Sequence, residues 1–450
     1  MRFAVRRGDV KEGRFDTAFR LSERTEKRQS RYKTIPLNEL VSFYSGGTPS
    51  KGRNDFWDGD IPWVSPKDFG PHTIYDSEDH ISLAGRIDAS LHLIPENSLL
   101  MVVRSGVLKH SLPVAVTGKP VTINQDLKAM IPLGEVLARY LADYFVVFGR
   151  QILPAISKHS TTVQSLNTPQ LESLPIPLPP LETQRVLVNE LEAARQSRRD
   201  KLAQADALLS SLDGWLLDQL GLQPPREEKR ACFAVRLGDL GNGKRMNADY
   251  FHPERVTAIR EQEQRKDVRA EALQDIADFC REVVSVEDTA IYLGLANVAS
   301  NTGELVNYDE EIAGNAFKFQ KDDVLFARLR PYLNKVYRAE SSGVCSPEFH
   351  VIRIRPATKP EDEILPDYLS TILRSSLILA QTRHMMTGNT HPRLANEDVT
   401  SLIVPIPRWE VQQTIADEVR SRREQARRLR DEAQAEWSAA KAHFEAQLLG

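Results

Sequence analysis

The amino-acid sequence repeats itself once, with a spacing of about half of its 450 residues. Residues 3–10 (FAVRRGDV) recur as residues 233–240 (FAVRLGDL), and residues 173–184 (SLPIPLPPLETQ) recur as residues 401–412 (SLIVPIPRWEVQ). The offsets of these matches are 230 and 228 residues. A repeat unit of this size is too large for a solenoid. The sequence therefore predicts two related halves within one chain, arranged as a pseudo-two-fold monomer.

Each half has the same internal order of short β-like runs, turn residues and then helix. The strands are expected at residues 61–64, 99–103, 113–116, 290–293, 324–327 and 350–354, and the helices at residues 135–147 and 365–382. This mixture predicts an α+β fold. A proline-punctuated strand follows in each half, PIPLPP or VPIP, and marks the exit from the β-rich region because proline cannot continue a ladder.

A single long helix is expected after each exit strand. Residues 181–220 contain no proline, and their apolar side chains follow one heptad frame: Val188, Leu191, Leu202, Ala205, Leu209, Leu212 and Leu216. Residues 409–449 carry a looser apolar stripe. Forty residues give about 60 Å of helix, which is longer than a small domain is wide. We therefore expect the two helices to pair with each other as a spacer. The alternative is that each helix packs only on its own domain.

The composition argues against a membrane or secreted protein and leaves nucleic-acid binding open. No apolar run approaches the roughly 20 residues of a membrane span, and the basic N-terminal residues have no following apolar segment of a signal peptide. Three scattered cysteines fit a reducing cytoplasm. The net charge of −3 neither supports nor excludes nucleic acid, because it can hide a basic face.

The sequence contains no complete enzyme motif. Gly238 to Lys244 satisfies a phosphate-loop pattern, but Arg245 stands where magnesium binding needs Ser or Thr. A dinucleotide fingerprint and metal-ligand spacing are both absent, and acidic clusters such as Asp55, Asp58 and Asp60 are typical of surface turns. We expect no catalytic residues, no metal and no cofactor.

Several motifs together resemble one known family. The first half contains IPLNEL (residues 35–40), GGTPSK (46–51), WDGDIPWV (57–64) and VTINQ (121–125). In the second half LQDIA (residues 273–277) matches the opening, although the GGTPS loop is absent there. Two α+β segments with these motifs, each followed by a P-x-P-x-x-E-x-Q turn into a long helix, are similar to the specificity subunit of type I restriction-modification enzymes. The resemblance covers residues 33–450.

The resemblance implies a domain plan and a function. Residues 33–180 and 270–407 would be target-recognition domains, each reading one half of a split, asymmetric site in double-stranded DNA. The helices at 181–221 and 408–450 would form an antiparallel coiled coil that fixes the gap and docks methylation subunits, two per complex, and through them restriction subunits. Methylation and cleavage would belong to those partners. Residues 1–32 would be an N-terminal extension, and residues 222–269 a linker with a repeat of it. The alternative is a non-catalytic coiled-coil adaptor that binds only protein.

DNA contacts are expected from polar and basic residues in loops. The candidates in the first half are Thr48, Ser50, Lys51, Arg53, Lys67, Arg104, Lys109, His110, Lys158, His159 and Thr161. Those in the second half are Arg281, Arg328, Arg330, Tyr332, Asn334, Lys335, Arg383, His384, Asn389, His391 and Arg393. For each residue a solvated charge or a turn position is the alternative. Arg328 and Arg330 share a strand-like face by alternation, so a role in a sheet competes with DNA contact.

An arginine-rich run from Arg420 to Arg430 has six arginines in eleven residues. One interpretation is a solvated helix face whose arginines pair with acids such as Glu424 and Glu432. The other is a surface that contacts DNA phosphates or docks an acidic partner protein.

Overall fold

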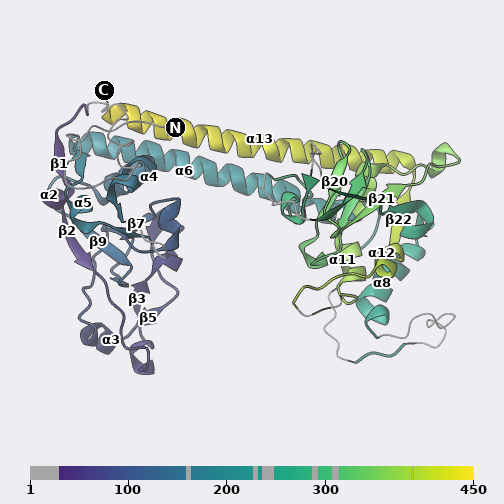
Figure 1. Ribbon diagram of the computed structural model, residues 1–450, viewed down its shortest axis with the longest axis horizontal. Helices are drawn as coiled ribbons and strands as arrows, with labels where there is room; N and C mark the ends of the chain where they lie inside the picture. Colours follow the sequence, from purple (N-terminus) through teal and green to yellow (C-terminus); the bar gives the residue numbers. More distant parts are fainter. Residues whose placement is uncertain are drawn as a thin grey trace. The chain divides into compact units, whose positions relative to one another are not determined.

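The computed structural model describes residues 30–158, 164–226, 232–235, 248–285, 292–306, 314–386, 388 and 390–449. The chain divides into two compact units. The first contains the described residues up to Lys201 together with those from Asp431 onward, and the second contains Leu202–Arg430. Each unit combines one β-rich region with part of each long helix (Figure 1), which confirms the predicted α+β class.

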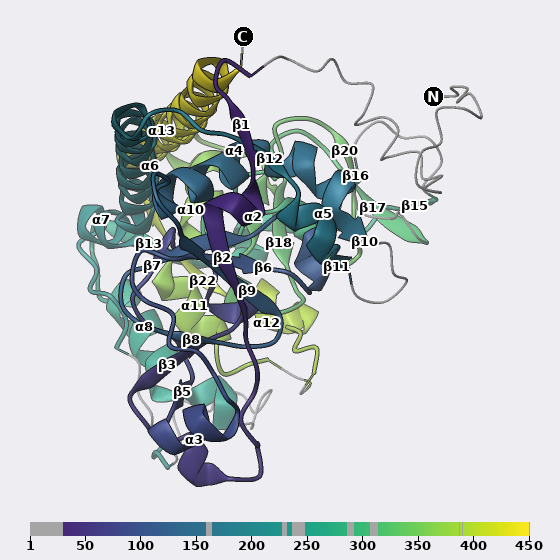
Figure 2. The same cartoon turned by 90° about the vertical axis from the view of Figure 1, so that its left-hand side faces the viewer.

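The first unit is built on a five-stranded sheet with the order β2-β9-β6-β7-β4. Its strands are β2 (Val41–Ser45), β9 (Leu127–Pro132), β6 (Leu99–Val102), β7 (Val114–Thr117) and β4 (Thr73–Ile74). The amphipathic helix α4 (Ala138–Ile156) buries its apolar face against this sheet (Figure 2). A smaller sheet contains β5 (His80–Ile81), β3 (Ile61–Val64) and β8 (Thr122–Ile123). The remaining short elements are α2 (Leu37–Leu40), α3 (Leu83–Asp88), α5 (Thr168–Glu172), β10 (Ser157–Lys158) and β11 (Ser165–Leu166).

The second unit has two four-stranded sheets. One contains β14 (Ala277–Cys280), β21 (Phe349–Ile354), β18 (Val324–Ala327) and β19 (Val336–Arg338), in that order. The other contains β15 (Val283–Ser285), β17 (Asn315–Phe319), β20 (Gly343–Cys345) and β16 (Tyr292–Leu293). The helices of this unit are α8 (Pro253–Glu263), α9 (Leu273–Ile276), α10 (Pro366–Ile372), α11 (Ser376–Thr382) and α12 (Asn396–Thr400).

The proline-rich exit strands lie in separate two-stranded ladders. In the first unit β12 (Pro175–Pro177) pairs antiparallel with β1 (Thr34–Pro36). In the second unit β22 (Ile403–Pro407) pairs antiparallel with β13 (Val268–Ala272). Each exit strand has one partner strand, which suits a segment whose prolines have no N–H to donate.

The long helices are α6 (Leu181–Ser210), α7 (Leu212–Gln219) and α13 (Trp409–Leu448). Within the first unit the start of α6 packs beside the end of α13, where Leu187 and Leu191 share a core with Phe444 and Leu448. Polar contacts in this unit join Glu190 to His443, Ser197 to Glu436 and Lys201 to Glu432. The residue numbers rise along α6 as they fall along α13, so the pairing is antiparallel.

The second unit shows the complementary ends of the same helices. Ile415 and Val419 of α13 share a core with Leu216, Leu217 and Leu220. The Arg422 guanidinium donates to the Ser211 hydroxyl at 3.0 Å. The helices therefore pack together, as expected, and each also packs on a β-rich region, so the two alternatives that the sequence left open both hold in part.

The same hydrogen-bond cluster occurs once in each unit, at an offset of 228 residues. The Tyr140 hydroxyl donates to the Pro177 carbonyl in the first unit, and the Tyr368 hydroxyl donates to the Pro405 carbonyl in the second. Gln184 accepts from the Leu137 N–H at 3.0 Å and donates to the carbonyls of Glu135 and Pro179, each at 2.9 Å. We call this set of glutamine contacts the glutamine clasp.

The second glutamine clasp is made by Gln412. It accepts from the Leu365 N–H at 3.0 Å and donates to the carbonyls of Glu363 and Pro407, at 3.1 and 3.0 Å. Both glutamines are fully buried. Each clasp joins the first turn of a long helix to the loop before a domain helix, so the duplication seen in the sequence is also a duplication of contacts.

Two helix predictions were wrong in detail. The helix expected at residues 181–220 is interrupted at Ser211, whose hydroxyl donates to the Leu208 carbonyl and competes with the backbone. The helix expected at residues 365–382 divides into α10 and α11. Here the Asn334 side-chain amide donates to the Arg374 carbonyl at 2.7 Å. In a continuous helix that carbonyl would instead accept from a backbone N–H of the next turn.

Candidate nucleic-acid interface

The loop around Thr48 is fixed against the end of β8. Gly46 lies so close to the carbonyls of Ile123 and Asn124 that an added Cβ would stand 2.1 Å from each oxygen. The Gly47 N–H donates to the Ile123 carbonyl at 3.1 Å, and the Thr48 hydroxyl donates to the Gln125 side chain. This close approach gives the GGT motif its physical reason.

Arg104 lies two residues beyond the end of β6 and contacts Asp126 and Ser165. Its Nε donates to Asp126 Oδ1 at 2.5 Å, and its backbone forms a bridge with Ser165. Ser165 pairs in turn with Lys158 across β10 and β11. The side chain of Arg104 remains 54% exposed despite its ion pair, so it has room to contact a ligand.

These contacts bring four residues into one connected patch, which we call surface 1: Thr48, Arg104, Gln125 and Lys158. Gln125 was not among the predicted contact residues, although the VTINQ motif contains it and the Thr48 loop depends on it. Lys109 and His110 are exposed at the end of the short helix Gly106–Lys109, which follows Arg104 in the chain.

Other candidates in the first unit lie elsewhere. Arg53 is held in a bidentate ion pair by Asp55, at 2.8 and 2.7 Å, and lies over the Phe56 ring. Lys67 binds Glu78 at 3.1 Å and Asp79 at 2.9 Å. Nearby acids therefore offset the charges of both residues. Ser50 and Lys51 are exposed in the same loop as Arg53.

The second unit repeats the framework of surface 1. The Val103 N–H donates to the Asp126 carbonyl, and the corresponding Arg328 N–H donates to the Glu348 carbonyl. The bridge between Arg104 and Ser165 corresponds to a bridge between Leu329 and Arg393.

Both units place an arginine–carboxylate pair at this point, but the arginine stands on opposite sides of the bridge. Arg393 donates from Nη2 to Glu348 Oε1 at 2.6 Å and from Nε to both carboxylate oxygens. This hydrogen bonding lowers the pKa of Glu348. The equivalent of Arg393 in the first unit is Ser165, where Arg104 supplies the charge from the other side of the bridge.

Four residues define surface 2: Arg281, Arg330, His391 and Arg393. The Arg330 N–H donates to the Pro392 carbonyl at 2.8 Å, which ties the loop after β18 to the His391 loop. Arg281 donates to the Asn396 side chain at 2.6 Å, three residues after Arg393. Tyr332 is 53% exposed in the turn that follows Arg330.

Several candidates in the second unit are used by the fold itself. Asn334 is buried and binds the Arg374 carbonyl, and Lys335 donates to the Leu295 carbonyl at 2.7 Å. The side chain of Arg328 has a buried Nε without a hydrogen-bond partner among the described residues. Burial, followed by the positive charge of Arg328, lowers the pKa of His350 to about 4. The expected alternation of Arg328 and Arg330 was wrong, because β18 ends at Ala327 and Arg330 has a φ of 50°.

Arg383 and His384 face inward, toward the buried Glu254. The Arg383 Nη1 lies 2.7 Å from one carboxylate oxygen and the His384 Nε2 lies 2.8 Å from the other. The His384 ring stacks on His252, with ring centroids 3.4 Å apart.

His252, Glu254 and His384 also have the atoms that could bind a metal ion within 4.8 Å of one another. Two features favour ion pairing over a metal there. Arg383 already brings a positive charge to the carboxylate, and His252 Nδ1 accepts from the Glu254 N–H at 3.3 Å. A metal-binding imidazole instead donates its second N–H.

Three predicted residues lie outside the described residues: His159, Thr161 and Asn389.

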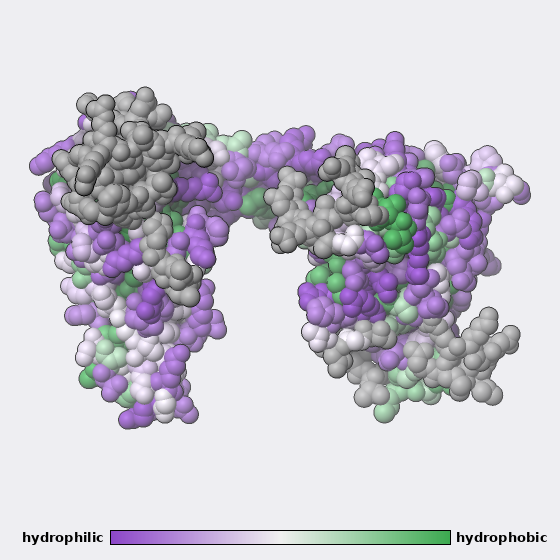
Figure 3. All heavy atoms as spheres, in the orientation of Figure 1, coloured by the Kyte–Doolittle hydropathy of each residue, from purple (hydrophilic) through white to green (hydrophobic). Residues whose placement is uncertain are grey.

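The arginine-rich run is engaged largely inside the second unit. Arg420 binds Asp417 at 3.0 Å, Arg422 binds Glu418 at 2.7 Å, and Arg430 binds Glu304 at 2.8 Å. These partners differ from the expected Glu424 and Glu432. Three of the six arginines thus have nearby acidic partners, as the first interpretation expects. Arg422 is only 17% exposed and Arg423 donates to the Thr302 carbonyl, so the run is not simply a solvated helix face. Figure 3 shows mostly hydrophilic surface on the described parts of both units.

None of the helices among the described residues is long and apolar enough to cross a membrane.

Comparison with known proteins gives one family. Residues 29–200 match the family described as type I restriction modification DNA specificity domain. The chain is 41% identical over 157 residues to the type I restriction enzyme EcoR124I/EcoR124II specificity subunit of Escherichia coli, covering 35% of this chain and 39% of that protein. It is 24% identical over 274 residues to the MjaIX specificity subunit of Methanocaldococcus jannaschii, covering 55% and 60%. The chain thus matches less than two thirds of the length of either relative.

Solved structures align over nearly the whole chain. The type I restriction-modification S subunit from M. genitalium aligns with a TM-score of 0.47 and 11% identity, covering 95% of this chain and 98% of that one. A chain from a study of complex assembly in the type I R-M system aligns with a TM-score of 0.49 and 13% identity, covering 92% and 96%. The family match includes all of surface 1 and the first glutamine clasp. On the sequence matches, residues 29–200 carry a type I restriction modification DNA specificity domain, and the chain is similar to specificity subunits of type I restriction enzymes.

Proposed function

We propose that the chain reads the DNA sequence for a type I restriction-modification complex and carries out no chemical step itself. Surface 1 and surface 2 each contact one half of a split site in double-stranded DNA. The observation that carries this proposal is the repeat of one framework in both units, with an exposed arginine–carboxylate pair at the same point in each.

The chemistry of the two surfaces suits direct reading of bases. Arginine, glutamine and histidine side chains recognise base edges, and lysine binds phosphates. A carboxylate that already orients an arginine keeps the guanidinium in a fixed geometry, so less conformational entropy is lost on binding. The arginine stands on opposite sides of the bridge in the two units, and the two half-sites are therefore expected to differ in sequence.

The two long helices keep both readers in one chain, and we propose that they set the gap between the half-sites. The paired helices also offer a docking surface for two methylation subunits, which bring the restriction subunits into the complex. Target-recognition domains at residues 33–180 and 270–407 remain our assignment of the readers.

The decisive experiment maps methylated bases. The chain is co-expressed with its cognate methylation subunit in a host free of DNA methylation, and the host genome is read by single-molecule sequencing. One asymmetric motif with two specified halves and an unspecified gap is expected, and it should vanish when the chain is omitted.

The competing function is an adaptor that binds only protein. If the chain is such an adaptor, no methylated motif should depend on it, and its DNA binding should be weak and insensitive to salt. Phosphate contacts instead make the DNA affinity fall steeply as the salt concentration rises. Absence of any motif that depends on this chain would remove the DNA-reading proposal.

A further inference from the structure

The second unit contains a cavity lined by two arginines, one aspartate and several apolar side chains. Its volume is about 310 Å³, which lies at the lower end of the range for small-molecule sites. It is bounded by α7, by the junction of α10 and α11, and by α13, and all of its lining residues belong to this unit. Leu209, Leu212, Leu379 and Val419 give it apolar walls.

Two arginines line the cavity, Arg374 and Arg423, together with one carboxylate, Asp213, whose Oδ1 accepts from the Ser376 N–H at 2.9 Å. Arg374 is 8% exposed, and its guanidinium donates to the Val336 carbonyl at 2.9 Å and to the Thr371 hydroxyl at 3.3 Å. Arg423 donates to the Thr302 carbonyl, and its Nε has no partner among the described residues. Both arginines therefore bind neutral oxygens.

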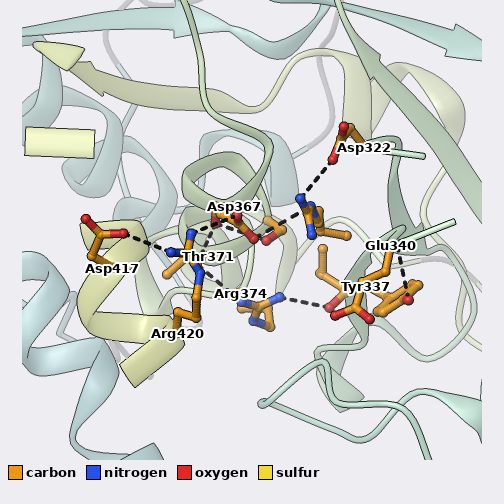
Figure 4. Close-up of polar contacts among 11 residues, drawn as sticks. Asp322, Tyr337, Glu340, Asp367, Thr371, Arg374, Asp417 and Arg420 are labelled. Atoms are coloured by element: carbon orange, nitrogen blue, oxygen red, sulfur yellow. Dashed lines mark hydrogen bonds and ion pairs between the residues drawn. The ribbon is translucent and has the colours of Figure 1, made fainter. Parts of the chain in front are cut away.

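Neighbouring arginines are treated differently by the fold. Figure 4 shows Arg420 turned toward Asp417 and Asp367, while Arg374 is turned toward Thr371. Arg338 pairs with Asp322 at 2.9 Å. Within the described part of the chain, carboxylates within 4 Å are recorded for Arg420 and Arg338 and for neither of the two cavity arginines.

An unpaired buried charge is costly, and two like charges in one cavity increase that cost. Burial, followed by the charge of Arg423, lowers the pKa of Arg374 well below its usual value. Asp213 can offset only one of the two charges, so an oxyanion entering the cavity would offset the remaining positive charge. The planar guanidinium fork binds phosphate oxygens in pairs. Ser376 also lines the cavity, and its hydroxyl has no partner among the described residues.

We propose that this cavity binds a small molecule that carries a phosphate group on an apolar body. Arg374 and Arg423 bind the phosphate, and the leucine and valine walls cover the apolar part. Because the cavity lies where α7 and α13 join the β-rich region of this unit, the bound molecule stabilises that junction.

The test uses three probes on the full chain: phenyl phosphate, inorganic phosphate and phenol. Isothermal titration is expected to show one phenyl phosphate per chain, weaker binding of inorganic phosphate, and no binding of phenol. Equal binding of phenol and phenyl phosphate, or the absence of saturable binding by any probe, would overturn the proposal.

The variants separate the cavity from general charge effects. Arg423→Gln is expected to weaken phenyl phosphate binding at least tenfold. Arg420→Gln is the matched control, because it removes the same charge from the same helix one turn away, at a residue that does not line this cavity. Ser376→Ala tests the cavity with a change that keeps every charge and should weaken binding by a smaller factor. Equal losses in Arg423→Gln and Arg420→Gln would reduce the site to nonspecific attraction and overturn the proposal.

Discussion

Arg393 and Glu348 form an ion pair with three hydrogen bonds, at the point where the first unit places Arg104 against Asp126. The two pairs occupy the same framework, but their arginines stand on opposite sides of the bridge. Neither guanidinium is buried by its partner, since the side chains of Arg104 and Arg393 are 54% and 41% exposed. This arrangement is expected of a charge that is oriented for a ligand.

Replacement of either arginine should weaken specific DNA binding. Arg104→Ala and Arg393→Ala are each expected to lower the affinity of the assembled complex for its site. If the arginine meets a phosphate, the slope of log affinity against log salt should shrink by about 0.9. If it meets a base, discrimination at one position of one half-site should relax by about 1–3 kcal/mol.

Arg355→Ala is the control for these variants, because Arg355 is an exposed arginine paired with Asp278 outside both surfaces. Fluorescence anisotropy at several salt concentrations measures all three. Equal losses in the control would show that only overall charge matters.

Equal lengthening of both long helices should change the gap and leave the half-sites as they are. Seven residues of helical sequence are inserted between residues 201 and 202 and between residues 430 and 431, where the two units divide. Matched insertions preserve the antiparallel pairing. The methylated motif, read by sequencing, should have a longer gap with unchanged halves.

Insertion in one helix alone is the control, and it should abolish methylation because the helices lose register. New bases in either half-site after the matched insertion would contradict the spacer role.

The tyrosine contacts should stabilise the two units alike. Tyr140→Phe removes the donor to the Pro177 carbonyl, and Tyr368→Phe removes the donor to the Pro405 carbonyl. Each change leaves a buried carbonyl with one partner fewer and should cost about 1 kcal/mol. Hydrogen exchange of peptides from β1 and β13, which pair with β12 and β22, should show faster opening only in the altered unit. Tyr75→Phe, at a tyrosine that is 63% exposed, should have no effect.

A buried acid, Asp143, and a half-buried histidine, His72, in the first unit should oppose each other as pH changes. Burial raises the pKa of Asp143 to about 6, although Arg195 beside it acts in the other direction. Burial also lowers the pKa of His72 to about 4. The Asp143 contribution to folding is present below pH about 4 and is lost as pH rises through 6. The His72 contribution is present above pH 6.5 and is lost as pH falls through 4.

Asp143→Asn should therefore expose the His72 contribution. Between pH 6.5 and 4 the free energy of unfolding should fall more steeply in the variant than in the unaltered chain, by an amount of about 3 kcal/mol. Denaturant unfolding at several pH values measures it. The double variant with His72→Gln should lose the added slope, and an unchanged slope in Asp143→Asn would count against this pairing.

The cysteines should differ in reactivity. Cys232 is exposed, whereas Cys345 is buried and burial raises its pKa to about 12. Because the thiolate is the reactive form, a disulfide reagent should modify Cys232 in the native chain and Cys345 only after unfolding. Mass spectrometry of the labelled peptides distinguishes the two. Early labelling of Cys345 would mean that the β20 region opens readily.

Local sequence patterns predicted the regular elements well. The strand at residues 61–64 and the strand at residues 324–327 lie where they were expected, because branched and aromatic side chains between turn residues suit a buried strand. The division of the helix at residues 365–382 was missed. It depends on Asn334, which reaches the Arg374 carbonyl from another part of the chain. A tertiary contact of this kind leaves no periodic signal in the sequence.

The candidate contact residues were only partly predictable for the same reason. Arg383 and His384 look like exposed basic residues in the sequence, but the buried Glu254 draws both inward. Gln125 was missed because only the folded chain brings it beside Thr48. Residue type indicates which side chains are able to contact DNA. Only the folded structure shows which of them already bind another residue of the chain.

The glutamine clasps have a consequence for how such a gene can change. Gln184 and Gln412 make the same three kinds of contact at the root of each long helix. A crossover in the DNA that encodes either glutamine would join one half's β-rich region to the other half's helix and still provide every donor and acceptor at the junction. Recombination at the clasp can therefore exchange one β-rich region for another without redesign of the helix that follows it.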